Sequence, residues 1–227
     1  MIEPDSSSVW EEIYSKGQRN RYPWDVIVTF VFRNAPQDVP RDKISILEVG
    51  CGTGSNLWFA AREGFSVSGV DGSRSAISSA KELFAKERLA GDLRVGNFTR
   101  LDFPDNHFDL VIDRGSLVCV GLKASANAVV ELKRVLKPGG RFFFNPYSSK
   151  HTSALAGLDG GDGLRRNIDK GTLTGVGSLC FYSREQLDNA IGQDWGVKSL
   201  QHVESVDLTY EQQSIHAEWR VVLEKHR

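Results

Sequence analysis

A glycine-rich segment, Ile46-Leu-Glu-Val-Gly-Cys-Gly-Thr-Gly-Ser-Asn56, constrains the fold of this chain more than any other part of its sequence. It predicts a buried strand that runs into a tight turn and then opens a helix. Gly50, Gly52 and Gly54 carry no Cβ, so the backbone of such a turn can approach a bound ligand closely. The spacing is G-x-G-x-G, and Ser55 stands where the dinucleotide-binding fingerprint G-x-G-x-x-G has its third glycine.

A second apolar run leads to an acidic residue of the kind that a nucleoside site uses. Residues 65–70 predict a strand that ends at Asp71, about twenty residues beyond the glycine turn. A carboxylate at this place can accept hydrogen bonds from both hydroxyls of a ribose. We therefore expect Asp71 and Gly72 to contact a bound nucleoside.

Strands and helices alternate along most of the chain, which predicts a parallel sheet with helices on both faces. Short helices are expected before the sheet begins, and Ser73 is expected to cap a helix within it. The expected strands are 44–49, 65–70, 93–95, 108–112, 141–145, 197–208 and 217–225, and the expected helices are 9–16, 24–33, 55–63, 73–84, 125–136 and 183–191, the fifth ending at the turn 138–140.

The turn E-V-G-C-G-T-G, Asp71 and the later Leu136-Lys-Pro-Gly-Gly-Arg141 together resemble the class I S-adenosylmethionine-dependent methyltransferases. The resemblance implies a doubly wound α/β fold whose seven-stranded sheet is mostly parallel, with the last strand antiparallel. It implies S-adenosyl-L-methionine as the cofactor and S-adenosyl-L-homocysteine as its product. We expect a single domain over 1–227, with a helical cover (1–43), a cofactor-binding core (44–146) and a lid or substrate loop with the C-terminal strands (147–227).

Ligands of an open parallel sheet bind beyond the carboxyl ends of its strands, which places several loops at one edge. Asn97 stands where the family commonly has an Asp, so only its carbonyl oxygen can accept the adenine amino proton. The segment from Trp10 to Asp25 resembles the part that closes over the cofactor in thiopurine- and tellurite-type methyltransferases, although its aromatic residues can equally be packing residues. The expected cofactor contacts are Tyr14, Arg19, Trp24, Gly50, Cys51, Gly52, Asn56, Asp71, Gly72, Asn97, Phe98 and Asp113.

Two histidines are the candidates for a general base. His151 follows the fifth expected strand, and an antiparallel last strand, as in the family, brings His216 and Glu218 to the same edge. A base is needed only where the methyl acceptor is a weakly acidic hydroxyl, because an amine or thiolate chiefly needs orientation and desolvation. A purely structural role stays open for each histidine.

The sequence therefore predicts a methyltransferase that acts on a small molecule. The more specific prediction is O-methylation of a hydroxyl on a sugar-like or other anionic metabolite, because Lys150, His151, Arg165 and Arg166 cluster where the acceptor is expected. N- or S-methylation of a neutral molecule, an NAD-dependent oxidoreductase and a non-catalytic cofactor-binding module are the alternatives. Residues 155–177 are rich in glycine and are expected to be a lid that orders with ligands.

Charge and composition argue against several other classes of partner. The formal net charge is −1, and no basic block is present to attract nucleic acid. No apolar run approaches membrane-spanning length, and Met1 to Ser8 lacks the pattern of a signal peptide, so a cytoplasmic protein is expected. The three cysteines are widely spaced, so no metal site is expected. A monomer or homodimer is expected.

Overall fold

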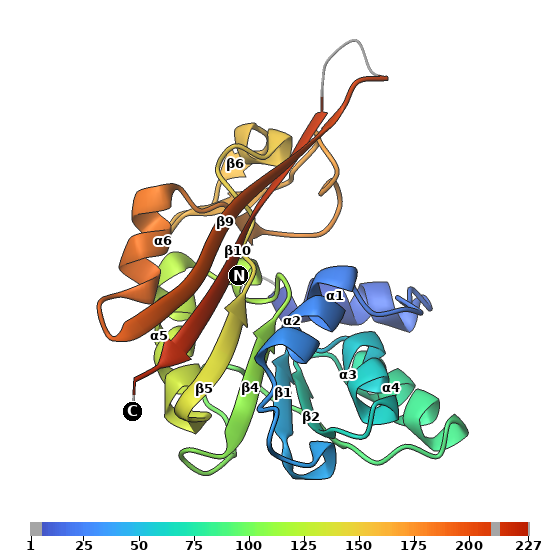
Figure 1. Cartoon of the computed structure of the whole chain (residues 1–227). Coiled ribbons are helices and arrows are strands. Elements are labelled where there is room, and N and C mark those ends of the chain that lie inside the picture. The colour runs from blue at the N-terminus through green and yellow to red at the C-terminus, as the bar shows by residue number, and fades with distance from the viewer. Residues whose placement is uncertain (1–5, 210–213, 227) are drawn as a thin grey trace.

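The computed structural model describes residues 6–209 and 214–226 and is built around one large twisted sheet (Figure 1). Its strands are β1 (Ser45–Val49), β2 (Ser66–Asp71), β3 (Asp92–Val95), β4 (Phe108–Asp113), β5 (Leu136–Phe144), β9 (Trp195–Asp207) and β10 (Ser214–Lys225). They are ordered β3-β2-β1-β4-β5-β10-β9. The strands from β3 to β5 run parallel, and β10 is antiparallel to both β5 and β9. This topology confirms the predicted fold class.

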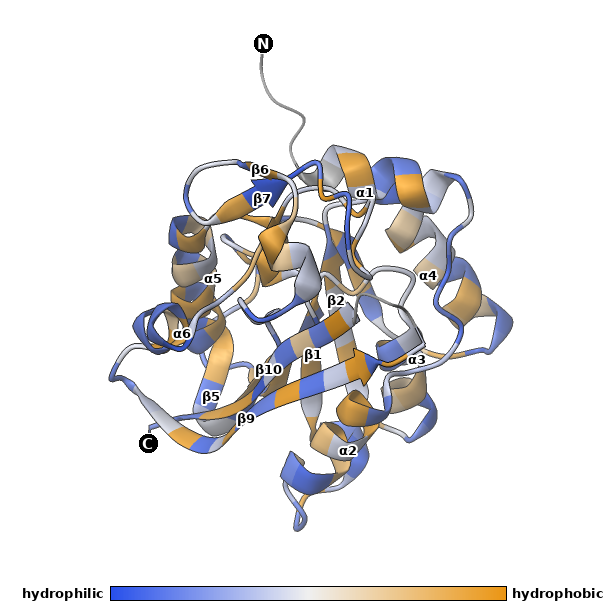
Figure 2. Cartoon of the chain, turned by 90° about the horizontal axis from the view of Figure 1, so that it is seen from above, coloured by the Kyte–Doolittle hydropathy of each residue, from blue (hydrophilic) through white to orange (hydrophobic). Residues whose placement is uncertain are grey.

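Helices cover both faces of the sheet, as the view from above shows in Figure 2. Ile46 and Leu47 are neighbours on β1, so their side chains point to opposite faces of the sheet. Both are fully buried because helices cover both faces. Ile46 packs in one core cluster with the helices α2, α3 and α4, whereas Leu47 packs in another with α5 and α6. The helices are α1 (Ser6–Ser15), α2 (Asp25–Asn34), α3 (Ser55–Arg62), α4 (Arg74–Lys86), α5 (Leu122–Val135) and α6 (Arg184–Ile191), with 3₁₀ turns η1 (Arg41–Lys43), η2 (Leu117–Cys119) and η3 (Thr152–Leu155).

Side-chain caps determine where two of these helices begin. The Ser73 hydroxyl accepts a hydrogen bond from the Ala76 N–H at 3.0 Å, so Ser73 caps α4 as predicted. Ser183 and Gln186 form a reciprocal capping box at the start of α6. Because α4 follows β2 directly, the cap also fixes the loop that leaves Asp71.

The fifth strand differs from the prediction. The sequence suggested a turn over residues 138–140 and a strand from Arg141, whereas β5 already begins at Leu136 and α5 ends at Val135. Leu136 pairs with Phe108 and Arg141 pairs with Leu110, so the four residues between them bulge out of the ladder opposite Asp109. The chain can bulge here because Pro138 has no N–H to lose and Gly139 adopts φ +77°.

The glycine-rich segment after β5 contains more regular structure than predicted. Three short strands, β6 (Leu158–Asp159), β7 (Leu164–Arg166) and β8 (Leu179–Cys180), form a small antiparallel sheet. Ile168, Leu173 and Leu179 are buried in the same core cluster as α5 and α6. These apolar residues anchor the segment, and its behaviour as a lid stays a prediction.

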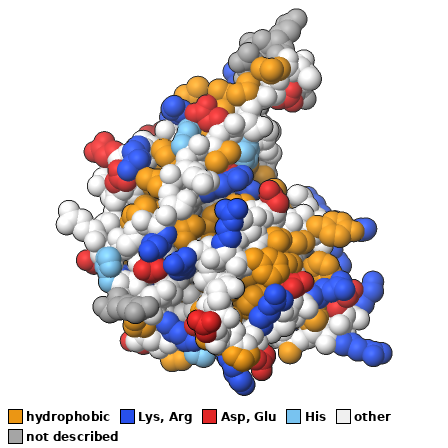
Figure 3. All heavy atoms as spheres, in the orientation of Figure 1, with side chains coloured by type: hydrophobic (Ala, Val, Ile, Leu, Met, Phe, Trp, Pro, Cys, Tyr) orange, Lys and Arg blue, Asp and Glu red, His pale blue; other side chains and the backbone are white. Residues whose placement is uncertain are grey.

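Charged side chains are spread over the surface. On the face drawn in Figure 3, Lys and Arg side chains are interspersed with Asp and Glu, in keeping with the net charge of −1. No helix within residues 6–209 and 214–226 is long and apolar enough to cross a membrane.

Candidate functional site

The glycine turn after β1 is packed so closely that positions 50 and 52 have no room for a side chain. Gly50 and Gly52 adopt φ +62° and +53°, which other residues rarely adopt. A Cβ on Gly50 would lie 2.1 Å from the Ser116 Cβ, and a Cβ on Gly52 would lie 2.6 Å from the Tyr14 hydroxyl oxygen. The turn therefore depends on glycine for its backbone conformation and for the close approach of two other elements.

Asp71, at the end of β2, holds this turn in place. Its Oδ2 accepts the Gly52 N–H at 2.8 Å, and its Oδ1 accepts the Ser73 N–H at 2.8 Å. Burial raises the pKa of the Asp71 carboxyl, although these two hydrogen bonds oppose the increase. Each carboxylate oxygen keeps further acceptor capacity. Asp71 can thus accept hydroxyl groups of a ligand while it fixes the backbone around it.

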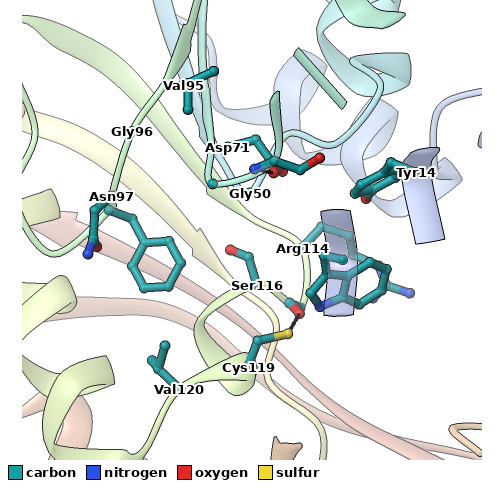
Figure 4. A pocket seen from close by; sticks show the side chains of 15 residues that line it. Tyr14, Gly50, Asp71, Val95, Gly96, Asn97, Arg114, Ser116, Cys119 and Val120 are labelled. Carbon is teal, nitrogen blue, oxygen red and sulfur yellow. Dashed lines mark hydrogen bonds between the residues drawn. The ribbon is translucent and has the colours of Figure 1, made fainter. Parts of the chain in front are cut away.

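A first cavity of about 470 Å³ opens beyond Gly50 and Asp71 (Figure 4). Six of the predicted contact residues line it, and they come from α1 and from the loops after β1, β2 and β3. They are Tyr14, Gly50, Asp71, Gly72, Asn97 and Phe98; the other lining residues are Trp10, Ser73, Val95, Gly96, Arg114, Gly115, Ser116, Cys119 and Val120.

The Asn97 side chain is turned differently from the prediction. Its carbonyl oxygen accepts hydrogen bonds from the Thr99 N–H and the Thr99 hydroxyl, both at 2.9 Å. This oxygen therefore serves the turn after β3, a local arrangement that is common for asparagine. The predicted role of the same oxygen as acceptor for an adenine amino group conflicts with these two bonds.

The side chain of Glu11 joins the helix α1 to the start of α4, next to the first cavity. Glu11 accepts hydrogen bonds from the hydroxyls of Ser73 and Ser75 at 2.6 and 2.5 Å, at the start of α4. These bonds lower the pKa of Glu11 to about 2, so it is charged at neutral pH. Trp10 and Tyr14, whose ring centroids are 5.7 Å apart, are thereby held on the cavity side of the helix.

A second cavity of about 490 Å³ adjoins the first. The two cavities share four lining residues, Trp10, Tyr14, Arg114 and Gly115. The predicted cofactor contacts Arg19 and Trp24 line only this second cavity, together with His216 from β10. Its remaining lining residues are Ile13, Gln18, Asn20, Tyr147, Thr172, Leu173, Val176 and Leu179.

Four other predicted contacts, Cys51, Gly52, Asn56 and Asp113, lie outside the lining of both cavities. Asn56 donates to Glu48 Oε1 at 2.6 Å and accepts the Trp24 N–H at 3.0 Å, so it joins α3 to the start of α2. Asp113 Oδ1 accepts from both the N–H and the hydroxyl of Ser116, which shapes the loop after β4.

Trp10 and Arg114 line both cavities, although neither was among the expected cofactor contacts. Trp10 precedes Tyr14 by one helical turn, so the two share a face of α1. Arg114 directly follows β4 at the site edge. Its guanidinium carbon lies 4.2 Å from the Trp24 ring centroid, and its Nη2 lies 3.7 Å from Glu218 Oε2. The strand-end rule pointed to both neighbours, Asp113 and Arg114, and the side chain of the second one faces the cavities.

Glu218 is a buried anion surrounded by cationic or protonatable groups. Its Oε1 accepts from Arg220 Nε at 2.7 Å, and its Oε2 lies 3.7 Å from both Arg114 and His216 Nε2. Burial favours the neutral acid, but His216 and the two arginines hold the pKa of Glu218 at about 2. The side chain is therefore ionised at neutral pH.

The two candidate bases lie together as expected from the antiparallel last strand. His151 Nε2 is 3.1 Å from His216 Nδ1, and the Thr172 hydroxyl oxygen lies 3.2 and 3.1 Å from these atoms. His151 is fully buried, and burial together with His216 lowers its pKa to about 4. Only His216 lines the second cavity.

The predicted cationic cluster does not converge on this cavity. Lys150 lies 3.5 Å from Glu204, Arg165 lines a separate hollow, and Arg166 donates to the Gly160 carbonyl at 3.0 Å. The cations that line the second cavity are Arg19 and Arg114. The sequence identified the segment, but the small sheet β6-β7-β8 directs its arginines elsewhere. Within the described ranges, no group of three or more His, Cys, Asp or Glu is placed to hold a metal ion.

Comparisons with known proteins find methyltransferases similar to the central part of the chain. Residues 46–140 match the model of a methyltransferase domain. An uncharacterized methyltransferase from Schizosaccharomyces pombe is 40% identical over 105 residues, which cover 42% of this chain and 37% of that protein. A sterol 24-C-methyltransferase from Gibberella zeae is 30% identical over 142 residues, covering 55% of this chain and 35% of that protein. The matched part thus spans little more than a third of these relatives.

Solved structures extend the likeness to the whole fold. An S-adenosylmethionine-dependent methyltransferase from Clostridium acetobutylicum superposes with a TM-score of 0.67, at 14% identity, over 95% of this chain and 96% of its own. The [4+2]-cyclase SpnF reaches a TM-score of 0.69 at 17% identity, over 100% and 98% of the two chains. Since one of these neighbours is a cyclase, the fold alone does not determine the reaction.

Proposed function

We propose that this chain is a class I S-adenosylmethionine-dependent methyltransferase, which transfers a methyl group from this cofactor to a small molecule. The cofactor occupies the first cavity, and the acceptor occupies the second. The observation that carries this proposal is the common boundary of the two cavities, formed by Trp10, Tyr14, Arg114 and Gly115.

The residues of the first cavity suit the parts of this cofactor. Asp71 accepts the ribose hydroxyls with the lone pairs that its backbone bonds leave available. The bare backbone at Gly50 admits the amino-acid part close to the end of β1. Phe98 offers an apolar surface for the adenine ring. A cavity of about 470 Å³ is within the range of small-molecule sites.

The shared boundary suits the geometry of methyl transfer. The acceptor atom must approach the methyl carbon in line with the breaking carbon–sulfur bond, so donor and acceptor must lie on opposite sides of the transferred group. Alignment of this kind supplies much of the rate of a two-substrate reaction. Trp10 and Tyr14 from α1, together with Arg114 from the β4 loop, border this meeting point.

The reaction that we favour is O-methylation of a hydroxyl on an anionic, for example sugar-like, metabolite. Arg19 and Arg114 supply positive charge in the second cavity, and the Arg19 side chain is 53% exposed and therefore accessible to a ligand. His216 supplies a group that can accept a proton. N- or S-methylation of a neutral molecule is the alternative, and it would give Arg19 no anionic group to bind and His216 no proton to accept.

Two measurements test the proposal. Calorimetric titration should show binding of S-adenosylhomocysteine and no binding of NAD; the reverse result would refute the cofactor assignment. Transfer from radiolabelled S-adenosylmethionine is then screened on 4-hydroxybenzoate, 4-hydroxybenzamide, 4-aminobenzoate and 4-mercaptobenzoate, and on glucose 6-phosphate paired with glucose. Preference for the anionic hydroxyl compound of each pair supports O-methylation. Faster transfer to an amine or thiol, or to the neutral partner, would favour the alternative.

A further inference from the structure

Three polar side chains that are far apart in the sequence meet at the wall of the second cavity. His151 follows β5, Thr172 precedes β8 and His216 lies in β10. Each of the three pairs has polar side-chain atoms 3.1 to 3.2 Å apart. Thr172 and His216 line the cavity, whereas His151 is fully buried behind them.

The proton positions of His151 follow from its backbone neighbour. The Ser153 N–H lies 3.0 Å from His151 Nδ1, and because an amide can only donate, Nδ1 carries no proton. His151 is neutral at physiological pH, since burial and the neighbouring His216 disfavour its charged form. Its single ring proton is therefore on Nε2, which faces His216 and Thr172.

The hydroxyl of Thr172 completes a directed chain of hydrogen bonds. It can donate one hydrogen bond and accept two. It lies 3.2 Å from His151 Nε2, from which it can accept, and 3.1 Å from His216 Nδ1, to which it can donate. His151 Nε2 also lies 3.1 Å from His216 Nδ1, so the His151 proton is shared between these two acceptors. In the neutral form of His216, the ring proton is then on Nε2, the atom that lies 3.7 Å from the ionised Glu218. One lone pair of the Thr172 oxygen remains, on a side chain that is exposed and lines the cavity.

We propose that Thr172 and His216 form a proton relay that removes the proton of a hydroxyl acceptor, with His151 as a positioning residue. This proposal rests on the proposed methyl transfer. The acceptor oxygen forms a bond to the methyl carbon, and the carbon–sulfur bond breaks with its electron pair moving to sulfur. The acceptor proton passes to the Thr172 oxygen as the Thr172 proton passes to His216 Nδ1. The resulting imidazolium faces Glu218, which supplies the opposite charge.

The first test reads proton positions and needs no acceptor. Side-chain ¹⁵N spectra of histidine-labelled protein distinguish protonated from unprotonated ring nitrogens. We expect an unprotonated Nδ1 on both His151 and His216, and a changed His216 Nδ1 signal in Thr172→Val that Thr172→Ser restores. A proton on His216 Nδ1 in the unsubstituted protein at neutral pH would overturn the relay.

The second test compares two nucleophiles on one scaffold, 4-hydroxybenzoate and 4-mercaptobenzoate. Thr172→Val should lower kcat for the hydroxyl compound about 10²–10⁴-fold, and lower it far less for the thiol, which is already ionised. Thr172→Ser should recover most of the loss. Thr174→Val is the matched control, since the Thr174 hydroxyl donates to the Gly171 carbonyl and lines neither cavity.

The outcomes separate the relay from the proposed function. Equal losses of kcat for the two compounds in Thr172→Val, or a loss that Thr172→Ser does not recover, would overturn the relay while leaving methyl transfer intact. Absence of transfer to every probe by the unsubstituted protein would count against the proposed function. The nitrogen spectra would then still decide whether the hydrogen-bond chain exists.

Discussion

The Asp71 carboxylate and the Gly52 N–H form a 2.8 Å hydrogen bond that joins the end of β2 to the glycine turn after β1. The other Asp71 oxygen accepts the Ser73 N–H, at the cap of α4. The acid that we propose as the ribose ligand therefore also sets the backbone conformation of the turn that borders the first cavity. In this proposal, ligand binding and loop geometry are coupled through one side chain.

Replacement of Asp71 by alanine should weaken S-adenosylhomocysteine binding by about 1–3 kcal/mol, since charged acceptors for the ribose hydroxyls are lost. This corresponds to an increase in Kd of roughly 5- to 150-fold in calorimetric titration. Asp102→Ala is the control, because the Asp102 side chain is fully exposed and lines neither cavity. An unchanged Kd in folded Asp71→Ala protein would show that Asp71 is not the ribose ligand.

A second prediction separates backbone strain from steric exclusion in the glycine turn. Gly50 and Gly161 both have positive φ, at +62° and +75°, but only a Cβ on Gly50 would meet other atoms, at 2.1 Å from the Ser116 Cβ. Gly161→Ala should cost about 1–2 kcal/mol of unfolding free energy from backbone strain alone. Gly50→Ala should cost about 1–3 kcal/mol more through overpacking, together with weaker cofactor binding. Equal costs in urea denaturation would contradict the observed packing.

A third prediction concerns the charge of the acceptor. If Arg19 binds an anionic group in the second cavity, Arg19→Ala should lower kcat/KM for 4-hydroxybenzoate about tenfold or more, and change it little for 4-hydroxybenzamide. The double variant Arg165→Ala/Arg166→Ala is the control, because neither arginine lines this cavity. Should the control alone reduce turnover of the anion, the acceptor would have to bind nearer to the small sheet β6-β7-β8.

The predicted residues that line the first cavity include two whose position depends on local chain geometry. A glycine turn after a buried strand and an acid after the next strand both lie at the carboxyl edge of a parallel sheet, so Gly50 and Asp71 were found without a structure. The seven-stranded sheet followed from the alternation of elements and the family resemblance, including the antiparallel β10 that brings His216 to this edge.

The features that the sequence did not predict depend on side-chain direction, tertiary contacts and strand register. The residues just after strand ends are all near the site, but Asp113 turns back to bind Ser116 whereas Arg114 faces the cavities. Thr172 gave no signal, because it meets His151 and His216 only through the tertiary fold. The bulge in β5 was missed because Pro-Gly-Gly usually ends an element, whereas here the ladder resumes after it.

A last prediction follows from Glu48, a buried acid beneath the glycine turn. Its Oε1 accepts from Asn56 at 2.6 Å, while its Oε2 is buried with no hydrogen-bond partner among the described residues. Burial raises the pKa of Glu48 to about 8, which the Asn56 bond opposes and the nearby Asp113 and Asp71 reinforce. The side chain is therefore a neutral acid in the folded protein at pH 7.

The pKa of Glu48 is higher in the folded protein than in the unfolded chain. Its contribution to stability is therefore complete below about pH 4.5 and is lost progressively as the pH rises through about 8. Glu48→Gln keeps the neutral shape and the Asn56 acceptor without titrating. Its melting temperature should exceed that of the unsubstituted protein by an amount that grows between pH 5 and pH 9. The expected increase is roughly 2–4 °C for each kcal/mol of unfolding free energy that the unsubstituted protein loses. If the melting temperatures of the two proteins change equally with pH across this range, the pKa of Glu48 is not raised in the folded protein.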